Sequence, residues 1–130
     1  MNNIIKTIIF LVLFIFCIQC GNISHERLIK SSKEFITEDG GHIDEKYGST
    51  QGFEKHFFKV KYIEDTIYAE AMQYVNACGN AIANINIKND TIILYTFETS
   101  KVVCASANYY KFKYWINNPD NKKYIILQSE

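Results

Sequence analysis

Short segments of alternating apolar and polar residues dominate the chain after Phe53, and they constrain its fold more than any other feature. Successive side chains of a strand point to opposite faces of a sheet, so such alternation predicts strands with one buried face. Fourteen of the 19 aromatic residues also lie between Phe53 and Tyr124, and aromatic residues favour strands. We therefore expect a mainly β domain over residues 53–130.

The first expected hairpin joins His56–Ile63 to Thr66–Val75 through the turn Glu64-Asp65. Its register sets Lys59 opposite Glu70 on one face, an opposite-charge pair that contributes about 0.2–1 kcal/mol. On the other face the same register pairs three sets of apolar residues: Tyr62 with Ile67, Val60 with Ala69, and Phe58 with Ala71.

The second expected hairpin joins Ala81–Lys88 to Thr91–Phe97 through Asn89-Asp90, residue types that tolerate a tight turn. Both turns are followed by Thr-Ile, so the same turn chemistry is used twice. The register pairs Ile87 with Ile92 and Ile85 with Leu94.

A third expected hairpin joins Tyr109–Ile116 to Tyr124–Leu127 through Asn118-Pro119-Asp120-Asn121, whose Asn and Pro suit a type I turn. This register pairs Tyr114 with Ile125, Phe112 with Leu127, and Trp115 with Tyr124. Lys101–Ala107 is expected to add a short strand. Six or seven antiparallel strands with one apolar face each predict a small β-sandwich or barrel, and the sequence does not choose between them.

Residues 1–19 have the pattern of a secretory signal peptide. Met1–Lys6 carries one positive charge, and Ile8–Ile18 is an unbroken apolar run of 11 residues. Because a transmembrane helix needs about 20 apolar residues, this run matches the apolar region of a signal peptide instead. We expect a helical leader and an exported protein.

The stretch Cys17-Ile18-Gln19-Cys20 resembles the lipobox that ends the signal peptides of bacterial lipoproteins, roughly Leu-Ala-Gly-Cys. The resemblance implies that Cys20 carries the lipid and becomes the mature N-terminus. Gln19 and Cys17 differ from that consensus, and an ordinary secretory signal is the alternative. In its leader and C-terminal strands the chain also resembles small lipoproteins of Gram-negative bacteria, which implies an outer-membrane anchor but no activity.

Cys78 and Cys104 remain after the leader is removed, and an exported compartment is oxidising. A disulfide between them would contribute roughly 3 kcal/mol by limiting the unfolded chain. The register of the second hairpin brings both cysteines to its open end, which favours the bond. Two free thiols or, without a C-x-x-C or nearby histidines, a metal site are the weaker alternatives.

Residues 20–52 are polar and rich in glycine, which indicates a tether between the lipid and the β domain. Leu28, Ile29, Phe35 and Ile36 also have the spacing of one short amphipathic helix. The pattern leaves both interpretations open.

The strand Tyr109–Ile116 provides the main candidate binding site. Alternation gives Tyr110, Phe112, Tyr114 and Ile116 to the core, and it turns the other set outward. Exposed rings between polar groups can bind a carbohydrate or a peptide, whereas packing of Trp115 against a neighbour is the alternative. The candidate strip consists of Tyr109, Lys111, Lys113 and Trp115.

Charge and motifs argue against several classes of function. Without Lys6, 13 basic residues oppose 14 acidic ones, a net charge of −1 with neutral histidines, so nucleic acid is not an expected partner. We find no metal, cofactor or nucleophile motif and no catalytic residues. The scattered histidines and adjacent acidic residues are expected to be solvated: His25, His42, His56, Glu38-Asp39, Asp44-Glu45 and Glu64-Asp65.

These features together predict a membrane-anchored envelope lipoprotein whose non-catalytic β domain binds a protein or a glycan. An immunity or inhibitor lipoprotein that neutralises a secreted toxin or enzyme is the alternative. A small hydrolase is less favoured, because the residues provide no set of nucleophile, base and orienting group.

Overall fold

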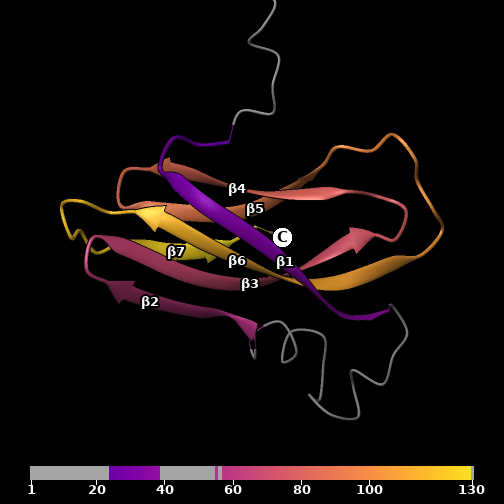
Figure 1. Cartoon of the computed structure of the whole chain (residues 1–130), viewed down its shortest axis with the longest axis horizontal. Helices are drawn as coiled ribbons and strands as arrows, with labels where there is room; N and C mark the ends of the chain where they lie inside the picture. The colour runs from indigo at the N-terminus through magenta and orange to yellow at the C-terminus, as the bar shows by residue number, and fades with distance from the viewer. Residues whose placement is uncertain (1–23, 39–54, 56, 130) are drawn as a thin grey trace, which may run out of the picture.

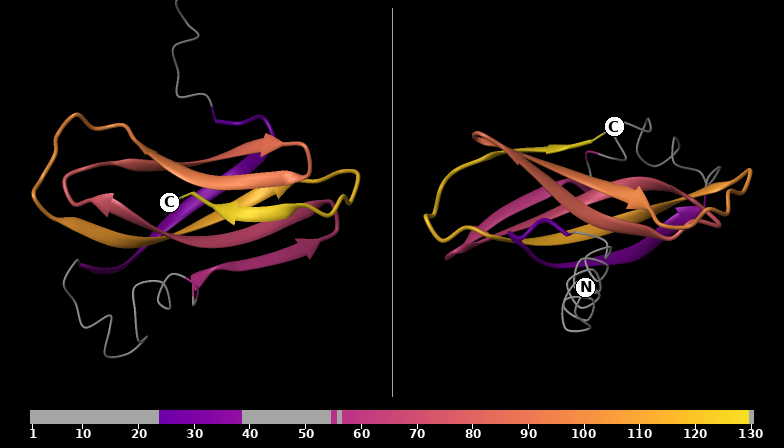
Figure 2. Two further views of the ribbon diagram at one scale, coloured as in Figure 1. Left: turned by 180° about the vertical axis from the view of Figure 1, so that it is seen from behind. Right: turned by 90° about the horizontal axis from the view of Figure 1, so that it is seen from above.

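A computed structural model describes residues 24–38, 55 and 57–129, which form two stacked β-sheets (Figure 1). The strand order is β1-β6-β3-β2 in a four-stranded sheet and β4-β5-β7 in a three-stranded sheet. Seen from above, the sheets form two layers (Figure 2) and are not closed into a barrel, so the sandwich prediction is confirmed. The strands are β1 Leu28–Glu38, β2 Lys59–Ile63, β3 Thr66–Asn76, β4 Ala81–Lys88, β5 Thr91–Glu98, β6 Ala107–Asn117 and β7 Ile125–Gln128.

The first two predicted hairpins are confirmed with their registers, except that β2 begins at Lys59 and the predicted pairing of Phe58 with Ala71 is absent. In β2–β3, Tyr62 pairs with Ile67 and Lys59 with Glu70. In β4–β5, the predicted apolar pairs Ile87–Ile92 and Ile85–Leu94 are present. The first residue of each turn adopts a left-handed backbone, with φ of 51° at Glu64 and 54° at Asn89. The similar turn sequences therefore fold alike.

The third predicted hairpin is wrong, although its turn is present. The N–H of Asn121 donates to the carbonyl of Asn118 at 3.0 Å, as the type I turn requires. After the turn, however, the chain crosses to the other sheet, and β7 pairs parallel with β5. Trp115 therefore lies in a different sheet from the strand that follows Tyr124, and the fold is not purely antiparallel.

Asn118 directs this crossing from inside the loop, where its side chain is fully buried. Its amide nitrogen donates to the carbonyl of Lys122 at 3.1 Å, and its amide oxygen accepts from the N–H of Lys122 at 3.2 Å. Its backbone N–H bonds to the carbonyl of Asp65 in the neighbouring turn. The contacts with Lys122 shape the loop locally, and the bond to Asp65 is a tertiary contact that no local pattern reveals.

The predicted tether or helix around Leu28–Ile36 is also wrong, because Leu28–Glu38 forms the edge strand β1. β1 pairs with β6 over nearly its whole length, with irregularities at Ile29 and Ile36. Pairing with β6 overrides the helical spacing, because β6 provides backbone hydrogen-bond partners along most of β1. The β domain therefore begins at Leu28 and not at Phe53.

Residues 101–106 do not form the expected short strand but a connection between β5 and β6. Val102 and Val103 in this connection are 62% and 76% exposed, and only Ala107 of the predicted segment belongs to a strand. Apolar β-branched residues suggested a strand here, but no neighbouring strand in the described part of the chain pairs with them.

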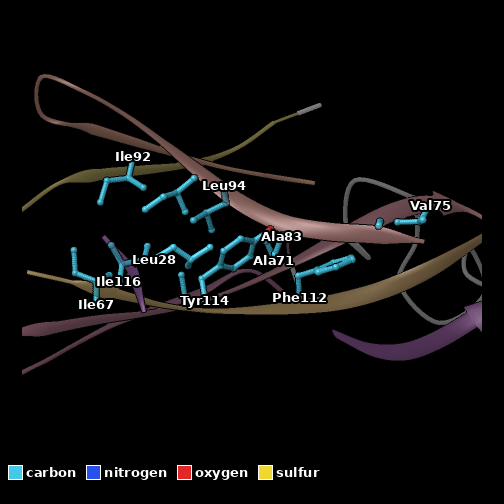
Figure 3. Close-up of a cluster of buried hydrophobic side chains, with 13 residues drawn as sticks. Leu28, Ile67, Ala71, Val75, Ala83, Ile92, Leu94, Phe112, Tyr114 and Ile116 are labelled. Atoms are coloured by element: carbon cyan, nitrogen blue, oxygen red, sulfur yellow. The ribbon is translucent and has the colours of Figure 1, made fainter. Parts of the chain in front are cut away.

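The core fills the space between the two sheets (Figure 3). As predicted, Phe112, Tyr114 and Ile116 of β6 are buried, and they face residues of the other sheet such as Leu94. Tyr110 is partly buried at the margin of this core. The core consists of Leu28, Ile67, Ala69, Ala71, Val75, Ala81, Ala83, Ile85, Ile92, Leu94, Phe112, Tyr114 and Ile116.

Candidate functional site

The predicted strip on β6 faces away from the core, but its two lysines are not free. The carboxylate of Glu34 on β1 forms ion pairs with Lys111 at 3.0 Å and with Lys113 at 2.9 Å. The hydrogen bond from Lys113, followed by that from Lys111, holds the pKa of Glu34 below its usual value, and the same bond raises the pKa of Lys113. The lysines therefore join β1 to β6.

Trp115 is partly buried by two neighbours on the same face. The ring centroids of Trp115 and Tyr68 are 5.1 Å apart, and the Lys30 ammonium lies 5.2 Å from the Trp115 ring. The Tyr68 hydroxyl donates to Glu70. Burial, followed by this hydrogen bond, raises the pKa of Tyr68 to about 12. The predicted contact of Trp115 with Tyr124 is replaced by this cluster.

Tyr109 is only 7% exposed, so the expectation that it is an exposed ring is wrong. It lies with buried Met72 in a small second cluster that Ile36 and Phe57 cover. Residues from β1 and from the segment before β2 thus bury this end of the strip. The strip as a whole is a packed and ion-paired surface, with little open aromatic area for a ligand.

A groove of about 900 Å³ lies between the two sheets instead. It lies beside the part of β3 that β2 does not cover. β2 begins at Lys59, opposite Glu70, whereas β3 continues to Asn76. The volume is within the range of about 300–1,000 Å³ typical of ligand pockets. The lining residues are Lys55, Phe58, Met72, Gln73, Tyr74, Val75, Thr96, Glu98, Ile126, Leu127, Gln128 and Ser129.

Gln73 is the chemically unusual residue of this groove. It follows the buried, core-facing positions Ala69 and Ala71 at the strand period, and it is itself 9% exposed. Its Nε2 has no hydrogen-bond partner among the described residues. An unpaired buried donor costs about 1–3 kcal/mol, so a native protein that keeps one often uses it.

Polar groups from both sheets also line the groove. The Gln128 side chain of β7 crosses the groove and donates to the carbonyl of Met72. The Glu98 carboxylate accepts the backbone N–H of Asn76 at 3.0 Å. Lys55 lies on the lining from the segment before β2. The groove therefore combines an apolar lining with a buried amide donor and charges of both signs.

Sequence reasoning missed this groove because it assigned β7 to the wrong sheet. The single available signal was Gln73 itself, a polar residue at a core position of the alternating segment Ile67–Val75. That signal identifies an unusual position, but it does not say that β5 and β7 lie across from it.

The disulfide between Cys78 and Cys104 is confirmed, with its Cα atoms 5.5 Å apart. Asn76 holds both ends: its side-chain oxygen accepts the N–H groups of Cys78 and Cys104 at 3.0 Å each. Its side-chain nitrogen donates to the Cys104 carbonyl at 2.8 Å. The bond therefore stabilises the end of β3 that carries the groove.

Several other predicted positions are only partly described. Glu64 and Asp65 are exposed at a turn, and His25 is partly buried, with its Nδ1 accepting the N–H of Arg27 at 3.2 Å. Within the described residues, no three potential metal ligands gather at one place. The leader, Cys20, His42, His56, Asp39 and Asp44-Glu45 lie outside the described residues.

No helix among the described residues has the length and apolar character needed to span a bilayer. In the comparisons with known proteins, no protein-family model matches the chain, and no curated sequence or solved structure resembles it significantly.

Proposed function

We propose that the chain is an exported, lipid-anchored envelope protein whose β-sandwich binds a partner in the groove between its sheets without catalysing a reaction. The observation that carries the binding proposal is Gln73, which lines a groove of ligand size and whose buried Nε2 has no hydrogen-bond partner among the described residues. A ligand that offers a carbonyl, carboxylate or hydroxyl oxygen would complete this hydrogen bond. The apolar lining around Gln73 would contribute the remaining affinity.

The path of the chain near its N-terminus supports the anchoring proposal. The N–H of His25 donates to the Asn84 side chain of β4 at 2.9 Å, and Arg27 donates to the Asn117 carbonyl at 2.9 Å. His25 follows Cys20 by five residues, a span of at most about 18 Å. A lipid on Cys20 would therefore keep the edges formed by β1 and β4 close to the membrane.

The groove lies on the other side of the sandwich from this anchoring point. β1 and β4 are edge strands in contact with each other, whereas β2 and β7 are the opposite edges of the two sheets. The groove is lined from the segment before β2 and from β7. An anchored domain would thus present the groove away from the lipid surface, where a partner has access.

The substitution Cys20→Ser tests the anchoring. We expect the variant to lose labelling by a palmitate analogue and to leave the membrane fraction, because the lipid is the proposed attachment. Cys17→Ser is the matched control and should retain both properties. Unchanged labelling and membrane partitioning of Cys20→Ser would contradict the proposal.

The substitution Gln73→Leu tests the groove. It removes a buried unpaired donor at nearly constant volume, so the free energy of unfolding should rise by about 1–3 kcal/mol in urea titrations. The same change should weaken a groove ligand about tenfold, the loss of roughly one hydrogen bond. Ligands come from a panel of peptides, oligosaccharides and acyl compounds and are identified in the unchanged chain by NMR at the Gln73 side-chain amide. Isothermal titration calorimetry then compares their affinity for the two proteins.

Exposed Asn86 on β4 provides the control, because Asn86→Ala changes a polar side chain outside the groove and should alter neither quantity. A panel in which no compound shifts the Gln73 amide would contradict binding in the groove. Destabilisation by Gln73→Leu would show that the carboxamide serves the fold.

A further inference from the structure

One side of the β7 backbone has no neighbouring strand in the described part of the chain. β7 pairs only with β5 among the described strands. The N–H groups of Ile125 and Ser129 donate to the carbonyls of Asp90 and Leu94 at 2.8 and 2.9 Å, so these residues direct their backbone groups toward β5. Alternation along the strand turns the N–H and C=O of Ile126 and Gln128 to the opposite side.

The Tyr62 hydroxyl covers the beginning of this open edge. It accepts the N–H of Tyr124 at 3.0 Å and donates to the Tyr124 carbonyl at 3.0 Å. One side chain therefore satisfies both backbone groups of Tyr124, the residue before β7. Ile126 and Gln128 continue the same edge along the groove lining.

The edge is short, at four residues, but it lacks a charged residue or a proline that would hinder strand pairing. Natural edge strands carry lysine, proline or a bulge that prevents another strand from adding to them. β7 has the sequence Ile-Ile-Leu-Gln and no charge, and the side chains of Ile125 and Leu127 are 60% and 49% exposed. An uncharged apolar edge of this kind can accept a short partner strand.

We infer that the groove ligand is an extended segment of a partner protein, which adds to β7 as a further strand of the three-stranded sheet. The alternating donors and acceptors of Ile126 and Gln128 are complementary to a polypeptide backbone, in contrast to a glycan or an acyl chain. Alternate side chains of the segment enter the groove beside Phe58 and Val75, and an oxygen of the segment accepts from Gln73. The inference rests on the proposed binding in the groove and specifies its ligand.

The experiment uses the exported chain, purified in mild detergent, and an acetylated and amidated Thr-Val-Thr-Val-Thr-Val peptide as a generic strand. We expect hydrogen exchange of the Ile126 and Gln128 amides to be fast in the free protein, whereas Leu127 and Ser129 exchange slowly. The peptide should slow exchange at Ile126 and Gln128 and shift the Gln73 side-chain amide. A peptide N-methylated at alternate residues, which cannot form the ladder, should bind about tenfold more weakly.

The alternative results are distinguishable. Equal binding of the N-methylated peptide, or binding only of oligosaccharides or acyl compounds at Gln73, overturns the strand inference and leaves the groove proposal intact. No shift at Gln73 with any compound overturns both. Protection of Ile126 and Gln128 that rises with protein concentration alone would identify a second copy as the occupant and would also overturn the inference.

Discussion

Trp115 on β6 contributes to the outer face of the four-stranded sheet through contacts with the two strands beside it. Tyr68 on β3 and Lys30 on β1 lie on the two sides of β6 at the same level, and their side chains contact the indole. Aromatic pairs of this kind contribute about 0.5–1.5 kcal/mol beyond their buried area. The single tryptophan therefore stabilises the packing of the sheet.

We expect Trp115→Ala to lower the free energy of unfolding by about 1–3 kcal/mol, because it removes the ring pair and exposes Tyr68. Urea titration measures the change. Trp115→Phe keeps an aromatic ring on Tyr68 and should lose less than half as much. An unchanged urea midpoint for Trp115→Ala would instead favour the exposed binding strip predicted from the sequence.

Among the elements, β1 is held to β6 by charge as well as by the backbone ladder. Glu34 of β1 contacts Lys111 and Lys113 on alternate positions of β6. Because these bonds lower the pKa of Glu34, the folded state holds the proton less tightly than the unfolded chain. The contribution of Glu34 to stability is therefore present above its unfolded pKa and is lost as pH falls through the lower folded value.

We expect Glu34→Gln to remove this dependence on acid pH. The variant should be less stable than the unchanged chain near neutral pH. The two stabilities should converge as the pH falls through the folded pKa of Glu34, which lies below the usual 4.5. Urea midpoints measured from pH 7 to pH 2.5 test this. The difference should shrink in high salt, since Glu34 is exposed and its ion pairs are screened. A salt-independent difference that persists at pH 2.5 would contradict the electrostatic explanation.

At the scale of the whole molecule, one side of the sandwich carries the N-terminal segment and the other side carries the groove. On one side, β1 and β4 lie together, and the N-terminal segment is fixed to β4 through His25 and Asn84. On the other side, β2 pairs with β3 only as far as Glu70, and the groove lies between the remainder of β3 and β7. The disulfide and Asn76 fix the end of β3 beside this groove. The fold therefore separates the proposed anchor from the proposed binding site.

The sequence alone determined the local features of this protein. Alternation and turn residues predicted four strands with their registers, including the Lys59–Glu70 pair, which has an ion pair at 3.9 Å. They also predicted the core face of β6 and the disulfide. These features follow from interactions between residues close in the chain or linked by one tight turn, so their patterns are visible in the sequence.

Only the tertiary structure decided which strands become neighbours across long distances. Leu28–Glu38 is a strand because β6 provides a ladder for it, and Ile125–Gln128 joins β5 because buried Asn118 turns the loop toward the other sheet. The groove exists only once β3, β5 and β7 are in place, and so does the buried position of the Gln73 amide, which has no partner among the described residues. Alternation within a strand specifies which of its two faces is apolar. Which strands pair with one another depends on how the apolar faces of all the strands are buried together.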